Sequence, residues 1–90
     1  MPRVRFTRHL RRFFPDLDDA EVEAGTVADV ITALDQRWPG LAAYIIDERG
    51  MLRQHVNVFI GEFMVKDRQN LEDSVAEDDE VFILQALSGG

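Results

Sequence analysis

The sequence contains no cysteine, and this absence removes several classes of function. Without thiols the chain has no disulfide framework, no thiolate zinc site and no cysteine nucleophile. The two histidines, His9 and His55, have no carboxylate or cysteine at ligand spacing, so neither is expected to bind a metal ion. We therefore expect neither redox chemistry nor a metal centre in the chain itself.

Long apolar runs and nucleotide-binding loops are also missing. The apolar stretches are far shorter than a membrane span, and no apolar stretch of the kind found in a signal peptide follows the early arginines. We expect a cytoplasmic protein with no membrane partner. There is no glycine-rich phosphate loop and no paired nucleophile and base, which disfavours a catalytic domain acting alone and means that any ATP binds to another protein.

Positive charge is scarce and unevenly distributed. Ten basic residues stand against 17 acidic ones, and the net charge of −7 disfavours nucleic acid as a partner, because phosphates would be repelled by most of the surface. The basic residues that precede the first acid, Asp16, are all arginines: Arg3, Arg5, Arg8, Arg11 and Arg12. This stretch is either a local docking patch or a polar strand face followed by a solvated turn.

The 90 residues, 46 % of them apolar, suffice for one domain with one core. "RVRFT" at residues 3–7 alternates between polar and apolar side chains and predicts a half-buried strand. "AEVEA" at residues 20–24 alternates in the same way. The intervening "PDLDD" favours a turn, so the two strands are expected to form a hairpin.

"GTVADVITALDQRWPG" at residues 25–40 predicts one amphipathic helix. Thr26 is the expected N-cap, Asp29 follows it by three residues, and Pro39 with Gly40 ends the helix. The apolar residues recur at helical spacing and line one stripe: Val27, Val30, Ile31, Leu34 and Trp38. This stripe must pack on an apolar surface, which the sheet provides.

The second half of the chain is predicted to complete the sheet. "VNVFI" at 56–60 and "FMV" at 63–65 predict strands joined by a tight turn, and "EVFILQA" at 80–86 predicts a central strand, since it is apolar on both faces. Residues 41–55 favour a short helical turn and then an irregular segment around Gly50. The order of elements predicts an α+β fold of the ubiquitin-like β-grasp type. In it one main helix crosses a mixed sheet of four to five strands, and the first and last strands are neighbours.

Three segments carry a resemblance to a known family. "DDEVFILQALSGG", "GTVADVITALDQRWPGL" and "HVNVFIGEFMV" resemble the final strand and tail, the helix and the third strand of the ThiS/MoaD family of sulfur-carrier proteins. The chain is more similar to the MoaD-type and cysteine-biosynthesis carriers than to the shorter thiazole carriers. It departs from the family in having Asp79 where a glycine is usual in the turn before the last strand.

The resemblance implies a function for the terminal Gly-Gly. An activating enzyme of the ubiquitin-activating type would use ATP to adenylate the carboxylate of Gly90, and a sulfur donor enzyme would convert it to a thiocarboxylate. An acceptor synthase in molybdopterin or cysteine biosynthesis would then take the sulfur. The chain would bind no cofactor and would be a co-substrate rather than an enzyme. Gly89, which has no Cβ, would allow the tail to pass through a narrow channel. Leu87 and Ser88 would extend the distance that the tail reaches from the domain.

We expect residues 1–86 to form the domain and residues 87–90 a flexible tail, in a protein that is monomeric alone. The expected partner surface is the sheet face away from the helix. If Val81 and Ile83 point into the core, Phe82 and Leu84 point outward beside Arg3 and Arg5, forming an apolar patch with a positive rim. In the alternative arrangement, residues 41–55 cover Phe82.

Two other functions are compatible with the same pattern. A ubiquitin-like modifier would begin with the same adenylate and end as an isopeptide on a lysine of a target protein. A non-covalent interaction domain would have an inert tail.

Overall fold

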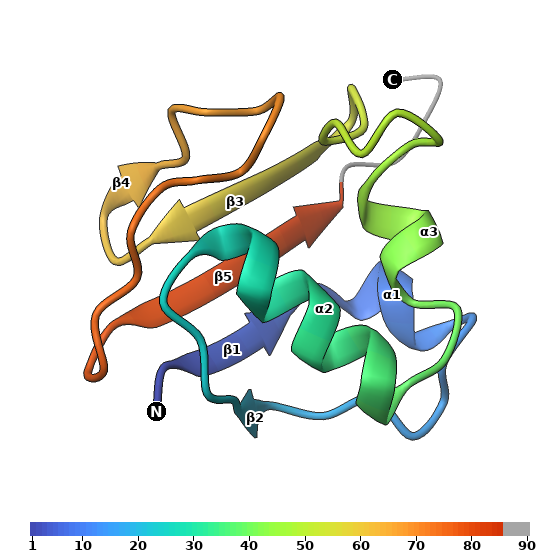
Figure 1. Cartoon of the computed structure of the whole chain (residues 1–90). Helices are drawn as coiled ribbons and strands as arrows, with labels where there is room; N and C mark the ends of the chain where they lie inside the picture. Colours follow the sequence, from blue (N-terminus) through green and yellow to red (C-terminus); the bar gives the residue numbers. More distant parts are fainter. Residues whose placement is uncertain (86–90) are drawn as a thin grey trace.

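The computed structural model describes residues 1–85, which form one mixed sheet with the strand order β2-β1-β5-β3-β4 (Figure 1). The strands are β1 (Arg3–Phe6), β2 (Ala20–Glu21), β3 (Val56–Ile60), β4 (Phe63–Met64) and β5 (Glu80–Gln85). The helices are α1 (Arg8–Arg11), α2 (Val27–Arg37) and α3 (Ala42–Ile45). The main helix α2 lies across one face of the sheet, which confirms the predicted α+β arrangement.

The last strand lies at the centre of the sheet. It pairs in parallel with β1, with Val4 opposite Val81, and antiparallel with β3, with Val58 opposite Ile83. These four side chains are at most 1 % exposed, because they lie under α2 in the core. Val81 and Ile83 therefore point into the core as predicted, and the alternation of strand residues places Phe82 and Leu84 on the opposite face.

The predicted cap and apolar stripe of α2 are both present. The backbone N–H of Asp29 donates to Oγ1 of Thr26 at 3.2 Å. Val27, Val30, Ile31 and Leu34 are buried, and the half-buried Trp38 caps the helix and packs edge-on against Phe6. The helix thus covers the sheet with the side chains that the sequence periodicity selected.

The structure corrects the prediction in the first quarter of the chain. Residues 8–11 form the short helix α1 where a turn was expected, because Leu10 turns into the core and is only 1 % exposed. A single helical turn is too short to show helical periodicity. The strand expected over residues 20–24 is only Ala20–Glu21, although it does pair antiparallel with β1 as the predicted hairpin requires.

Residues 41–55 begin with α3 and continue as an irregular segment, as predicted. The carboxylate of Asp47 accepts the backbone N–H groups of Arg49 and Met51 at 2.9 and 3.1 Å. Gly50 completes this turn with a φ of +82°, a conformation that disfavours residues with a Cβ. Leu41, Ile45 and Leu52 anchor the segment in the main core.

The loop before β5 supports the start of α2. The carbonyl oxygens of Leu71 and Asp73 accept the backbone N–H groups of Ala28 and Val27 at 2.9 and 3.1 Å. Leu71 holds a positive φ of 56°, which is uncommon for leucine. The Asp67 carboxylate stabilises this conformation, since it accepts backbone N–H groups on both sides of Leu71.

We expect the Asp67→Asn variant to be less stable than the wild type above pH 4 and to lose less stability in acid. The backbone N–H of Asn70, aided by others in the loop, lowers the pKa of Asp67 from 3.8, against an opposing effect of desolvation. A carboxyl group whose pKa is lower in the folded than in the unfolded state stabilises the fold at pH values above its unfolded-state pKa. This stabilisation is lost as the pH falls through its folded-state pKa. Urea unfolding between about pH 2 and 7 measures the difference. Asp16→Asn, a change at an exposed turn residue, is the control, and equal acid sensitivity of the Asp67→Asn variant and the wild type would contradict the prediction.

Candidate functional site

The candidate site begins where β5 ends. The backbone N–H of Gln85 donates to Oγ1 of Thr7 at 3.2 Å, and the backbone N–H of Thr7 donates to the carbonyl of Ile83 at 3.2 Å. These two bonds fix the last described residue of β5 to the end of β1. The predicted reactive and tail residues lie outside the described residues: Leu87, Ser88, Gly89 and Gly90.

We expect the Thr7→Val variant to keep its fold and to loosen the end of β5. Valine has nearly the shape of threonine but no acceptor for the Gln85 N–H, so amide hydrogen exchange at Gln85 should become several-fold faster, in line with the loss of one hydrogen bond. Exchange at Val81, deep in the same strand, should not change. Thr7→Ser keeps the hydroxyl and should restore slow exchange at Gln85. Equal exchange in the valine and serine variants would exclude this role for the hydroxyl.

A shallow pocket of about 240 Å³ adjoins the end of β5. Its lining residues come from α3, from the segment before β3 and from β5 itself: Ala43, Tyr44, Arg53, His55 and Gln85. Nε of Arg53 donates to the carbonyl of Ala43 at 2.8 Å, which fixes the position of the arginine. The side-chain oxygen of Gln85 is buried and has no hydrogen-bond partner among the described residues. Figure 1 shows α1 and α3 beside this end of the strand.

The sheet face opposite α2 carries an apolar row. The register places Arg5, Phe82, Phe59 and Met64 side by side across β1, β5, β3 and β4. Phe82 is half-buried and Met64 is 50 % exposed. The row therefore extends past the predicted Phe82 and Leu84 to residues that sequence reasoning missed. Their signal was the alternation in "VNVFI", which puts Phe59 on the face opposite Val58.

Residues 41–55 do not cover this row with their buried side chains. Leu41, Ile45 and Leu52 belong to the same core cluster as Val81 and Ile83, and this cluster lies on the α2 side of the sheet. The alternative in which this segment covers Phe82 is therefore not supported. Phe82 and Leu84 therefore lie on the sheet face opposite α2.

The predicted positive rim of this face is in fact mixed in charge. Nε of Arg5 lies 3.5 Å from Oδ2 of Asp19 and 3.6 Å from Oε1 of Glu80. Arg3 borders a shallow hollow together with Glu21 and the acidic turn before β5. Because acids flank both arginines, the rim offers no net positive field to a partner.

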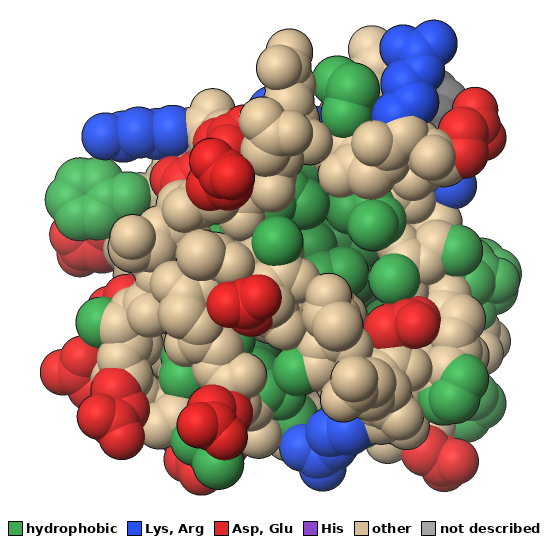
Figure 2. All heavy atoms as spheres, viewed as in Figure 1, with side chains coloured by type: hydrophobic (Ala, Val, Ile, Leu, Met, Phe, Trp, Pro, Cys, Tyr) green, Lys and Arg blue, Asp and Glu red, His purple; other side chains and the backbone are tan. Residues whose placement is uncertain are grey.

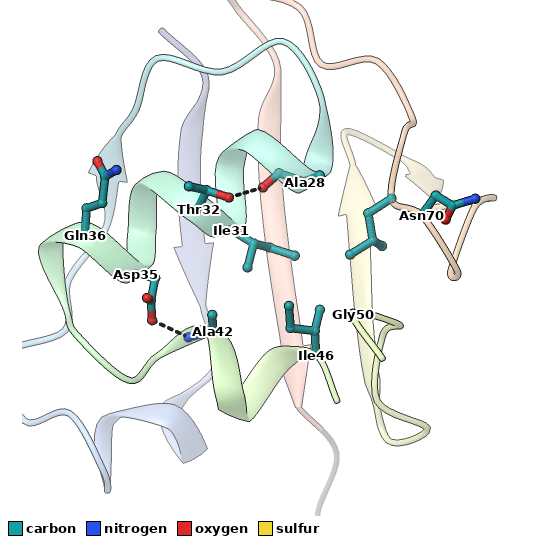
Figure 3. Close-up of a pocket in the computed structure, with 10 residues that line it drawn as sticks. Ala28, Ile31, Thr32, Asp35, Gln36, Ala42, Ile46, Gly50 and Asn70 are labelled. Carbon is teal, nitrogen blue, oxygen red and sulfur yellow. Dashed lines mark hydrogen bonds between the residues drawn. The ribbon is translucent and has the colours of Figure 1, made fainter. Parts of the chain in front are cut away.

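A second hollow lies on the α2 side of the molecule. This pocket of about 380 Å³ is lined largely by small and apolar side chains of α2, α3 and the loops at Gly50 and Leu71 (Figure 3). Two of its polar side chains are engaged within the fold: Oγ1 of Thr32 donates to the Ala28 carbonyl, and Oδ1 of Asp35 accepts the N–H of Ala42. Figure 2 shows hydrophobic side chains in a hollow near the centre of this face, with acidic side chains among those around it. The pocket holds no arrangement of nucleophile and base.

Neither a metal-binding cluster nor a membrane-spanning helix is found among the described residues. Within residues 1–85, no three or more His, Cys, Asp or Glu side chains are grouped so that they could hold a metal ion. Among the helices described, none is long and apolar enough to cross a membrane.

The comparisons with known proteins agree on one family. The ThiS family model matches residues 4–90. A chain of the BexX/CysO complex from Amycolatopsis orientalis is 27 % identical, with a TM-score of 0.85 and full coverage of both chains. Two structures share the fold at lower identity. Mycobacterium tuberculosis CysO is 24 % identical, with a TM-score of 0.84 and coverage of 97 % of this chain and 100 % of that chain. SAMP1 from Haloferax volcanii is 23 % identical, with a TM-score of 0.75 and coverage of 98 % and 97 %.

A search of curated proteins gave no match. The family match spans nearly the whole chain, and the β-grasp order of strands and helix is shared with the solved structures. The chain therefore belongs to the ThiS family of ubiquitin-like sulfur carriers.

Proposed function

We propose that the carboxyl group of Gly90 is the reactive group of a sulfur carrier and is converted to a thiocarboxylate. The observation that carries this proposal is that the family match runs through residue 90, while the central strand β5 leads directly toward this terminal Gly-Gly. A strand at the sheet centre is held on both sides, so the domain provides a rigid base for the residues that follow it.

The chemistry requires activation by another protein. A carboxylate is a poor electrophile, because its negative charge repels nucleophiles and oxide is a poor leaving group. Attack of the Gly90 carboxylate on the α-phosphate of ATP releases pyrophosphate and gives an acyl-adenylate. Sulfide equivalents from a donor enzyme then form the C–S bond as the C–O bond to AMP breaks. In this proposal the activating and donor enzymes supply the catalytic groups for these steps, and the chain acts as a co-substrate.

The recipient of the sulfur is proposed to be a synthase of cysteine or molybdopterin biosynthesis. The likeness to a chain of the BexX/CysO complex, at 27 % identity and full coverage, favours cysteine. That structure also supports a direct protein partner, because the carrier there is part of a complex. The activating enzyme is proposed to bind the outer face of the sheet. The contact is proposed to be the row that contains Phe82, with Leu84, Arg3 and Arg5 around it.

The test is intact-protein mass spectrometry on a chain with an untagged C-terminus. The protein is incubated with ATP, a candidate activating enzyme and a sulfur source, and the expected result is a mass gain equal to replacement of one oxygen by sulfur. Omission of ATP should prevent the gain. A ladder of conjugates to other proteins would instead indicate a modifier. An unchanged mass with every activating enzyme of the source organism would overturn the proposal.

A further inference from the structure

Arginines in and directly after α1 lie close in the chain to Thr7, which is bonded to Gln85 at the end of β5. Arg8 follows directly after Thr7, whose hydroxyl accepts the N–H of Gln85. Arg53 borders the pocket that Gln85 also lines. Segments far apart in the sequence thus meet near the end of β5, and Figure 1 shows α1 and α3 beside this end of the strand.

The charges of these arginines are only partly neutralised. Two of the three acids that follow α1 are already engaged: Oδ1 of Asp18 lies 3.6 Å from Nη2 of Arg11, and Oδ2 of Asp19 lies 3.5 Å from Nε of Arg5, whereas Asp16 is exposed. Arg8 and Arg12 are exposed and form no ion pair with any described residue. An exposed arginine that forms no ion pair remains available to a partner.

Aromatic side chains lie beside these arginines. Phe13, next to Arg12 in the chain, is 53 % exposed although it stacks on Tyr44 of α3 with 4.8 Å between ring centroids. Tyr44 lines the same pocket as Arg53. Aromatic residues and arginine are both enriched in the cores of protein interfaces. We call Arg8, Arg12, Phe13, Tyr44 and Arg53 the tail-end patch.

The opposite end of β5 has the opposite charge. The strand starts in the acidic sequence Glu77-Asp78-Asp79-Glu80, and its six residues separate that turn from Gln85 by about 20 Å. The molecule is acidic overall, with a net charge of −7, and three of its ten basic residues, Arg8, Arg12 and Arg53, belong to the tail-end patch. Such a charge separation orients a protein as it approaches a charged partner.

We propose that the tail-end patch docks on an acidic protein surface and so presents the tail first to the enzyme that acts on it. This inference rests on the proposed function, because it takes that surface to surround the opening through which the activating enzyme receives the Gly-Gly. The patch is separate from the row across the outer face of the sheet. The arginines govern approach and orientation, and the Phe13–Tyr44 pair supplies apolar contact once the surfaces meet.

The first experiment does not depend on an activating enzyme. An octaglutamate peptide is titrated into the ¹⁵N-labelled chain at low salt, and amide shifts are recorded. We expect the largest shifts at residues 7–13, at Tyr44 and at residues 53–55. These shifts should disappear at about 0.5 M salt, because the Debye length is then only a few Å. Arg8→Glu should abolish these shifts, whereas Lys66→Glu, an equal charge change at an exposed residue of the other sheet edge, should preserve them. Shifts located elsewhere, or insensitive to Arg8→Glu, would overturn the inference.

The second experiment uses the activating enzyme that produces the mass gain. At low salt we expect Arg8→Glu and Arg12→Glu each to raise the KM for the carrier about tenfold and to leave kcat unchanged, with the effect falling below about twofold at 0.5 M salt. Lys66→Glu should have little effect at either salt concentration. Equal KM values for the Arg8→Glu and Lys66→Glu variants would contradict the inference. If no enzyme produces the mass gain, the proposed function fails, and the peptide titration alone decides whether the patch binds acidic surfaces.

Discussion

Removal of Gly89 and Gly90 is expected to abolish thiocarboxylate formation and to leave the stability of the domain unchanged. The shortened chain still ends in a carboxylate, that of Ser88, but this group lies up to about 7 Å closer to the domain and follows a residue with a Cβ. A carboxylate that cannot reach the α-phosphate of ATP gives no adenylate. The expected result is no mass gain at any enzyme concentration that fully converts the wild type.

The unchanged stability follows from where the core lies. The buried apolar side chains that the structure describes all fall between Pro2 and Ile83, so the deletion removes none of them. Thermal unfolding should therefore match the wild type within about 1 °C, as expected when no ordered contact is lost. The matched control replaces Gly89 by alanine, which keeps the length and adds one methyl group. Full mass gain in the deletion variant would show that the terminal glycines are not the reactive segment.

The sheet and main helix were predictable because their signals are local and periodic. Val4 and Phe6 alternate with arginines, and the stripe of α2 repeats at helical spacing, so each pattern identifies one buried face. Central placement of β5 was predictable for a related reason. A strand with apolar residues on both faces cannot lie at an exposed edge, and the structure places it between β1 and β3.

The features that the sequence did not predict depend on contacts between distant segments. The helix α1 has only four residues, and its formation depends on burial of Leu10 against elements that follow much later. The positive φ of Leu71 depends on the Asp67 carboxylate and on the N-terminus of α2. Neither a four-residue helix nor an unusual backbone angle leaves a periodic pattern in the sequence.

The candidate site was predicted in part for the same reason. Alternation alone shows that Phe82 and Leu84 face away from the core. The neighbours of these residues depend on strand order and register, which bring Met64 and Phe59 into the row and place Asp19 and Glu80 beside Arg5. A prediction based on the alternation of Arg3 and Arg5 alone therefore gave a positive rim where the structure has a mixed one.

Replacement of Phe82 by threonine is expected to weaken binding of the activating enzyme by roughly 10- to 100-fold, the usual effect of truncating an aromatic side chain at the centre of an interface. Threonine, like phenylalanine, is favoured in strands, and Phe82 is only half-buried. The loss of stability should therefore be about 1 kcal/mol or less. Binding is measured by isothermal titration with the full-length chain. Circular dichroism and thermal unfolding confirm that the variant is folded.

Phe63→Thr is the matched control, because it removes the same side chain from a position that is 73 % exposed yet outside the row. Phe63 pairs with Ile60, whereas the row on the outer face contains Met64 opposite Phe59. If exposure alone determined binding, Phe63→Thr would have the larger effect, since its ring is the more accessible. If the row is the interface, Phe82→Thr has the larger effect, because a partly buried ring flanked by Phe59 and Arg5 is already fixed in position and loses little side-chain entropy on binding. Equal or reversed effects would move the interface to the edge strand β4 and exclude the outer face as the surface that the activating enzyme binds.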